Sequence, residues 1–216
     1  MKQVQTRRFL LGGVSVMAIA AALSGCAAAI VGGAVAGGMV ATDRRTAAAQ
    51  LEDENIELRA VNNLTATFGE RAHLNVTSYN ALVLLTGEVP TAQDKLLAEQ
   101  IVSRVANVRS IVNEVAVMPN TTMTQRSSDS LITGQVKASM VDTSDLFANS
   151  FKVVTERGVV YLMGRVTQRE ADRATEIARS VSGVKRVVRV LEIVSEAELQ
   201  KAPAPAPAAS SAAPKT

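Results

Sequence analysis

Cysteine and histidine, the side chains most often used as nucleophiles and metal ligands, each occur once in this chain of 216 residues, as Cys26 and His73. A single residue of each type excludes an internal disulfide and the usual four-ligand zinc sites. His73 precedes an expected strand, and we interpret it as a surface or packed residue. The sequence places no base beside a nucleophile and has no Gly-rich phosphate loop. We therefore predict a protein without catalytic residues, bound metal or non-covalent cofactor.

The position of Cys26 indicates covalent acylation. A positively charged start precedes an apolar stretch over residues 9–23, which is short for a bilayer span and typical of a signal peptide. This stretch ends in Leu23-Ser24-Gly25-Cys26, which resembles the bacterial lipobox, where the cysteine is acylated after cleavage. We predict a signal peptide over residues 1–25 and an acyl anchor on Cys26 that is effectively permanent. By resemblance to Gram-negative lipoproteins, Ala27 at the next position favours the outer membrane.

The segments at the two ends differ in composition from the middle of the chain. Residues 26–50 begin with the acylated Cys and an Ala/Gly-rich stretch, which predicts a flexible tether with an end-to-end distance of roughly 25–30 Å. The alternative is a small-residue packing face, with Gly33 and Gly37, in the lipid interface. Arg7 and Arg8 leave both general and twin-arginine export open. Ala-Pro repeats predict an extended, disordered tail over residues 195–216.

An internal repeat organises the rest of the chain. Val83-x-Leu85-x-Gly87-x-Val89 recurs 77 residues later as Val160-x-Leu162-x-Gly164-x-Val166. Around each copy the apolar spacing predicts a helix, a hairpin, a second helix and a last strand, so that two helices pack on a small mixed three-stranded sheet. The fold class is therefore α+β with two tandem αββαβ domains. The expected parts are a first domain over residues 51–118, a linker over residues 119–129 and a second domain over residues 130–194.

The details of each copy follow from the same spacing. The hairpins should turn at Tyr79-Asn80 and Arg157-Gly158, because these residues tolerate positive φ angles. The first helices are expected at about residues 54–68 and 130–141, and the last strands at residues 111–118 and 187–194. The second helices are expected to bury these residues: Leu97, Ile101 and Val105 in the first copy, and Ala174, Ile177 and Val181 in the second.

These repeats resemble the BON domain, and two copies behind a lipobox are similar to dual-BON outer-membrane lipoproteins over residues 26–194. The resemblance implies a lipid-anchored, periplasm-facing protein of the outer membrane that supports envelope integrity, with enrichment at the division site. It also implies that the first helix of the second domain contacts phospholipid. The corresponding residues are Leu131, Gly134, Gln135, Lys137, Ala138 and Val141. Leu131 would be the inserting wedge, because Ile132, Val136 and Met140 share the core face; a single exposed leucine without a role is the alternative.

Charge distinguishes the two copies. The overall charge of +3 comes from residues 1–25, so the remaining chain is neutral and nucleic-acid binding is not expected. Residues 47–118 have a net charge of −4, whereas residues 119–194 have a net charge of +3. Anionic phospholipid should therefore attract the second copy. Arg186 and Arg189 could contact head groups or form the solvated face of an edge strand.

A second function remains open beside lipid binding. The acidic first copy could dock a basic envelope-assembly or division protein, which would make the chain a protein-interaction scaffold. The two functions differ in one test, because a scaffold without lipid affinity does not bind anionic vesicles. The sequence leaves the oligomeric state open.

Overall fold

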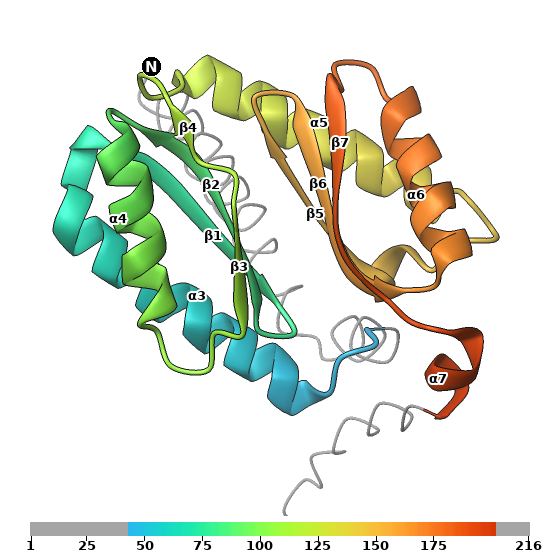
Figure 1. The fold of residues 1–216 in the computed structure, drawn as a ribbon. Helices are drawn as coiled ribbons and strands as arrows, with labels where there is room; N and C mark the ends of the chain where they lie inside the picture. Colours follow the sequence, from blue (N-terminus) through green and yellow to red (C-terminus); the bar gives the residue numbers. More distant parts are fainter. Residues whose placement is uncertain (1–42, 202–216) are drawn as a thin grey trace, which may run out of the picture. The chain divides into compact units, whose positions relative to one another are not determined.

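A computed structural model describes residues 43–201, which form two successive α+β domains (Figure 1). The predictions about the signal peptide, Cys26, Gly33, Gly37 and the Ala-Pro repeats lie outside the described residues. The first domain consists of α3 (Ala47–Phe68), β1 (His73–Tyr79), β2 (Leu82–Val89), α4 (Ala92–Ser103), β3 (Ser110–Asn113) and β4 (Ala116–Val117). The second domain consists of α5 (Met123–Val141), β5 (Phe151–Glu156), β6 (Val159–Val166), α6 (Gln168–Ser180) and β7 (Arg186–Ile193), and α7 (Glu196–Lys201) follows it.

Each domain has a mixed sheet with two helices on one face, as the repeat predicts (Figure 1). The hairpin strands β1 and β2 are antiparallel, and β3 and β4 both pair in parallel with β2. In the second domain, β5 and β6 are antiparallel and β7 pairs in parallel with β6. The central strands β2 and β6 bury Val83 and Leu85, or Val160 and Leu162, under the helices.

Several element boundaries differ from the predictions. Helix α3 begins at Ala47 rather than near residue 54, and α5 begins at Met123 rather than near residue 130. In each case a threonine caps the helix: Thr46 accepts a hydrogen bond from the backbone N–H of Ala49, and Thr122 accepts one from Gln125. A threonine at this position satisfies a backbone donor that the helix leaves free. The first turns are polar or consist of alanine, so apolar periodicity misses them, and parts of the expected tether and linker are helical.

Other details of the expected elements also change. Leu97 does not enter the core, because α4 turns Ala98 and Val102 inward and leaves Leu97 37% exposed. In the second copy the expected burial of Ala174 and Ile177 is confirmed. The last strand of the first domain is interrupted between β3 and β4, and residues expected in the tail form α7.

The geometry of the hairpins explains why the repeated motif contains a glycine. A Cβ atom at Gly87 would lie 1.9 Å from the carbonyl oxygen of His73, and one at Gly164 would lie 2.4 Å from that of Ser150. Both distances are far below van der Waals contact, and the clashing atom is backbone that cannot rotate away. The motif therefore needs glycine where the two strands of each hairpin approach most closely.

The two sheets also share a core that the sequence analysis did not anticipate. On the faces turned away from the helices, a third apolar cluster combines residues of both domains. Its fully buried members are Tyr79, Leu84, Tyr161, Met163 and Val190. Tyr161 and Met163 are 1% and 0% exposed and cluster with Tyr79 and Leu84 of the first domain, so we expect the second domain alone to expose apolar surface. The two domains are therefore one packed unit over the described residues.

Candidate functional site

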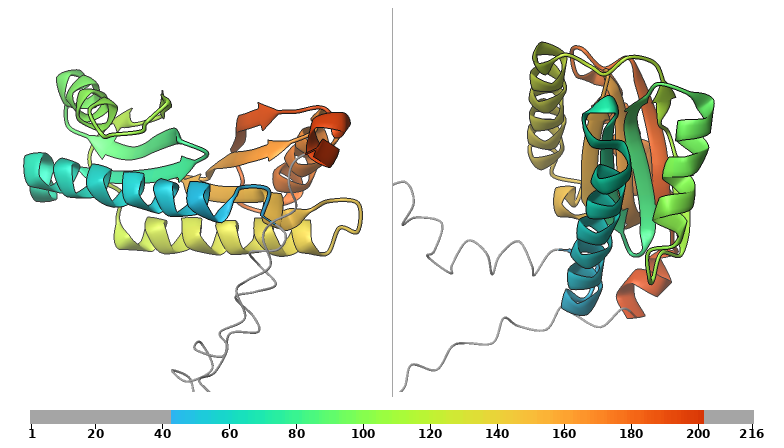
Figure 2. Two further views of the ribbon diagram at one scale, coloured as in Figure 1. Left: turned by 90° about the horizontal axis from the view of Figure 1, so that it is seen from below. Right: turned by 90° about the vertical axis from the view of Figure 1, so that its left-hand side faces the viewer.

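The outer face of α5 is the main candidate surface. It consists of the exposed residues Met123, Leu131, Gly134, Gln135, Lys137, Ala138 and Val141. Met123, Leu131 and Val141 are 73%, 69% and 68% exposed, which is high for large apolar side chains. On the side of α5 that is turned away from the sheets, Figure 2 shows no other described helix or strand. The six α5 residues that the resemblance points to are thus exposed together on one helix.

The charge content of this face is unusual for a helix in contact with water. Lys137 is the one charged residue among the exposed positions of α5. Helix α6 of the same domain is covered instead by charged side chains, namely Arg169, Asp172, Arg173, Glu176 and Arg179. A solvated helix usually carries charged residues on its outer side. The outer face of α5 therefore has the composition of a contact surface.

The inner side of α5 holds the helix firmly on its sheet. Ile132, Val136 and Met140 are buried at 7%, 0% and 1% exposure, as the helical spacing predicts. Asp129 is also buried, and its carboxylate accepts hydrogen bonds of 2.8 Å from the backbone N–H groups of Arg157 and Gly158. The carboxylate thus satisfies one buried and one partly buried backbone donor of the β5–β6 turn. This anchoring fixes which side of α5 faces outward.

The two arginines expected near head groups lie elsewhere in the second domain. Arg186 and Arg189 are on β7, which is separated from β5 by β6, whereas α5 packs over β5. Arg186 lies 3.3 Å from Glu114 of the first domain. Arg189 pairs with Asp172 of α6 at 2.8 Å. The structure therefore does not bring Arg186 and Arg189 to the outer face of α5, and it favours the edge-strand interpretation.

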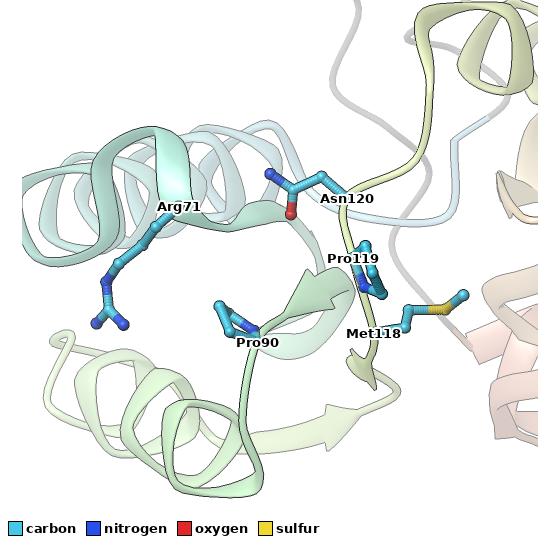
Figure 3. Close-up of a pocket in the computed structure, with 5 residues that line it drawn as sticks. All are labelled: Arg71, Pro90, Met118, Pro119 and Asn120. Atoms are coloured by element: carbon cyan, nitrogen blue, oxygen red, sulfur yellow. The ribbon is translucent and has the colours of Figure 1, made fainter.

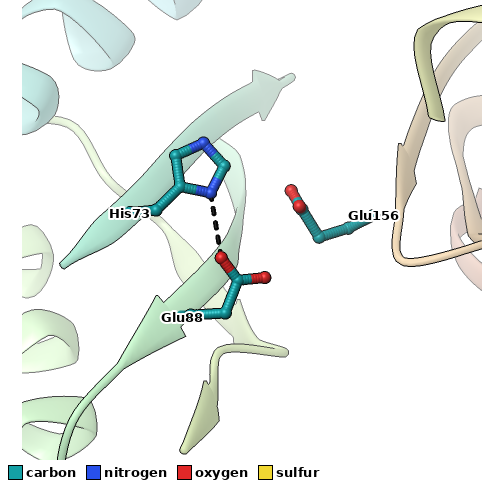
Figure 4. Close-up of side chains that lie close together, drawn as sticks. All are labelled: His73, Glu88 and Glu156. Carbon is teal, nitrogen blue, oxygen red and sulfur yellow. Dashed lines mark hydrogen bonds and ion pairs between the residues drawn. The ribbon is translucent and has the colours of Figure 1, made fainter. Parts of the chain in front are cut away.

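A second cluster lies where the domains meet. His73 Nδ1 is 3.0 Å from Glu88 Oε2, and Glu156 of the second domain points toward both residues (Figure 4). One nitrogen and two carboxylate oxygens lie within 4.8 Å of one another, a donor set that could hold a divalent cation. However, the guanidinium of Arg157 already pairs with Glu88 and donates to the carbonyl of Gly87 at 3.2 Å. The protein itself thus supplies the compensating positive charge.

The carboxyl groups of this cluster have opposite electrostatic environments. Burial would raise the pKa of Glu88, but hydrogen bonds from Thr121, Arg157 and His73 outweigh burial and lower it. Burial raises the pKa of Glu156, and the nearby charge of Glu88 adds to the effect, although Asn75 donates to the carboxylate at 3.0 Å. Of these two carboxyl groups, Glu156 is therefore the one whose environment favours the neutral form.

Sequence reasoning missed the segment that precedes α3. The run Asp43-Arg44-Arg45 has the composition of an exposed polar segment, yet its two arginines form ion pairs with different domains. Arg45 pairs with Asp43 at 2.7 Å and with Asp53 of the first domain at 2.8 Å. Arg44 makes two hydrogen bonds, of 2.7 and 2.8 Å, to Glu170 of the second domain. No signal in the sequence distinguishes these partners from solvent.

A shallow pocket of about 340 Å³ lies in the first domain (Figure 3). It is lined by Arg71, Pro90, Met118, Pro119 and Asn120. The guanidinium of Arg71 is paired with Asp94 at 2.9 Å, so it is not free to bind an anion. We assign no role to this pocket.

The repeated αββαβ fold defines the class of protein. The family model of the BON domain matches residues 52–119 and 128–195, and the chain belongs to the BON family. The chain is 39% identical over 172 residues to the outer membrane lipoprotein DolP of Haemophilus influenzae, which covers 79% of this chain and 89% of that protein. It is 37% identical over 154 residues to a 21 kDa hemolysin of Actinobacillus pleuropneumoniae, which covers 70% and 79%. Among the described helices, none is sufficiently long and apolar to span a bilayer.

Proposed function

We propose that this chain is a non-enzymatic outer-membrane lipoprotein, anchored through acylated Cys26 and facing the periplasm, that binds anionic phospholipid through the outer face of α5. The similarity to a relative named as an outer membrane lipoprotein supports the location. The observation that carries the lipid proposal is the outer face of α5, which exposes Leu131 and Val141 and has Lys137 as its charged residue. At the cellular level, we propose support of the outer-membrane barrier, including at the division site.

The expected affinity is modest, and the anchor makes it sufficient. A fully buried leucine or valine gains about 1.5–3 kcal/mol, so partial insertion of two or three side chains gains a few kcal/mol in total. Lys137 adds about 1 kcal/mol near an anionic surface. Because an acyl anchor would hold the domain near the same leaflet, binding becomes effectively intramolecular at millimolar effective concentration. Lipid contact through α5 would then orient the protein rather than retain it.

Vesicle flotation tests this function directly. The chain from residue 26 onward, carrying Cys26→Ser to remove the acyl anchor, is mixed with phosphatidylglycerol vesicles or with phosphatidylcholine vesicles at low ionic strength. We expect flotation with the anionic vesicles that decreases with added salt. Failure to float with anionic vesicles would contradict lipid binding. Both domains must be present, because the second domain shares its sheet core with the first.

The second candidate is a scaffold that docks a basic protein through the acidic first domain, whose net charge is −4. Exposed apolar residues on its helices, Leu51 and Leu58 on α3 and Leu96 on α4, each 61% exposed, are compatible with such a contact. The scaffold predicts no vesicle binding by the unanchored chain. It also predicts loss of barrier function on charge reversal at Glu54 of α3, with barrier function unchanged by Leu131→Asp.

A further inference from the structure

Phe147, in the loop that follows α5, is an exposed aromatic residue in a chain with few aromatics. Its side chain is 62% exposed. Every other aromatic side chain among the described residues is buried, with exposures of 7% or less for Phe68, Tyr79, Phe151 and Tyr161. A phenylalanine ring stabilises a fold when folding buries it away from water. Phe147 stays exposed, so it contributes little to the stability of this fold. An external apolar partner would account for it.

The cation next to Phe147 is paired with a carboxylate and held in place. The guanidinium of Arg44 lies over the ring, 5.7 Å from its centroid. Arg44 is held by both carboxylate oxygens of Glu170 and donates to the carbonyl of Arg165 at 3.1 Å. The side chain of Glu170 is only 2% exposed. Burial alone would raise the pKa of Glu170, but the hydrogen bond from Arg44 contributes to a net lowering of this pKa. Arg44 is therefore committed to Glu170 and serves to support the ring rather than to bind a free anion.

The same contact marks where the N-terminal chain reaches the folded unit. Arg44 directly follows Asp43, the first described residue, so the chain from Cys26 meets the second domain beside Phe147. The 17 residues from Ala27 to Asp43 can extend at most roughly 60 Å. On the proposed function, the acylated end and the outer face of α5 share one leaflet. Phe147 then lies at the entry point of the anchored chain, six residues beyond Val141.

We propose that Phe147 inserts into the same leaflet as the acyl chains of Cys26, as a second apolar contact beside the outer face of α5, and that Arg44 is the positioning residue that supports it. This inference rests on the proposed function. Aromatic rings favour the bilayer interface, where one side of the ring is apolar and the other faces polar groups. Along α5, Met123 and Val141 are about 27 Å apart. Phe147 follows Val141 by six residues in the chain and would add a contact after the helix.

The absence of tryptophan from the chain allows a direct test. Phe147→Trp, Gly134→Trp and Leu96→Trp each introduce a single tryptophan, respectively at the proposed contact, on α5 and on α4 of the first domain. Its emission is excited selectively over that of the two tyrosines. Leu96 is a matched control because its side chain is 61% exposed, close to the 62% of Phe147. The chain from residue 26 is coupled through its only thiol to a maleimide lipid in phosphatidylglycerol-containing vesicles. Brominated acyl chains then report insertion by quenching the emission.

We expect quenching and a blue shift at positions 147 and 134 but not at position 96. Adding Arg44→Gln or Glu170→Gln should reduce quenching at position 147 more than at position 134. Glu170→Gln retains a side chain that can still cap α6. In the unanchored chain with Cys26→Ser, Phe147→Ala should weaken vesicle binding about tenfold, and Leu96→Ala should leave it unchanged. Quenching at position 134 without quenching at position 147 would overturn this inference and leave the proposed function intact. Quenching at neither position would overturn both.

Discussion

Asp53 of the first domain and Asp129 of the second occupy the same position relative to their hairpins. Asp53 accepts hydrogen bonds from the backbone N–H groups of Asn80 and Ala81 at 2.8 and 2.9 Å. Asp129 does the same for Arg157 and Gly158. All four turn residues have positive φ angles, which leaves their N–H groups pointing at the helix. In both domains a buried carboxylate thus fixes the first helix to the hairpin, and in the second domain it sets the direction of the outer face of α5.

Asp129→Ala should destabilise the chain by about 2–4 kcal/mol, because one buried and one partly buried backbone donor lose their acceptor. Denaturant unfolding measures the change. Asp142→Ala, at an exposed position just after α5, is the control and should change the free energy of unfolding by less than about 0.5 kcal/mol. An effect of Asp129→Ala as small as that expected for Asp142→Ala would show that the Asp129 contacts contribute no stability.

Leu131→Asp should reduce binding to anionic vesicles at least about tenfold, because it removes an inserting side chain and adds a charge that the surface repels. Leu58→Asp on α3 is the matched control, since Leu58 is 61% exposed and Leu131 is 69% exposed. Vesicle flotation of the two variants measures the difference. A similar loss for both variants would show that the effect comes from charge alone and not from α5.

Gly134→Ala should stabilise the chain by about 0.5–1 kcal/mol, because glycine in a helix interior loses more backbone freedom on folding than alanine. A Cβ atom at this position meets no other atom within 4 Å, so there is no opposing clash. Thermal or denaturant unfolding provides the measurement. Gly87→Ala should act in the opposite direction and strongly destabilise the fold, since its Cβ would collide with the carbonyl of His73. Destabilisation by Gly134→Ala would mean that α5 is covered at that point.

Glu156→Gln should make the stability of the domain junction less sensitive to rising pH. Burial raises the pKa of Glu156 above its ordinary value of 4.5. Its protonated form therefore contributes stability at low pH, and this contribution is lost as the pH rises through the raised value. We expect the variant to match the original chain near about pH 4 and to be more stable near about pH 8. Unfolding free energies at the two pH values provide the comparison.

Glu88→Gln supplies the contrast within the same cluster. Burial opposes ionisation of Glu88, but hydrogen bonds from Thr121, Arg157 and His73 lower its pKa, so its charged form contributes stability above the unfolded value of 4.5. This contribution is lost as the pH falls through the lowered value. The variant should therefore lose more stability near about pH 8 than near about pH 4. The same pH profile for Glu88→Gln and Glu156→Gln would contradict the assigned environments.

The fold of each domain can be predicted from its local sequence pattern. The repeated Val-x-Leu-x-Gly-x-Val motif and the spacing of Ile132, Val136 and Met140 suffice, because strand and helix periods are local properties of the chain. The same spacing left Leu131 outside the core, and the structure places it on the surface. Helix starts were less accurate, since capping by Thr46 and Thr122 depends on one polar side chain rather than on a period.

The packing of the two domains against each other depends on the tertiary structure, because no local pattern specifies it. Tyr161 and Met163 alternate with core residues on β6, and this alternation is compatible with a sheet face that contacts either solvent or a second sheet. Their burial against the first domain depends on residues about 80 positions away in the sequence. Likewise, Arg44 meets Glu170 across 126 positions of sequence. Charge pairs of this kind have no local periodicity, because they form where the fold brings two distant groups together. The contact between Arg44 and Phe147 therefore could not be predicted from the sequence.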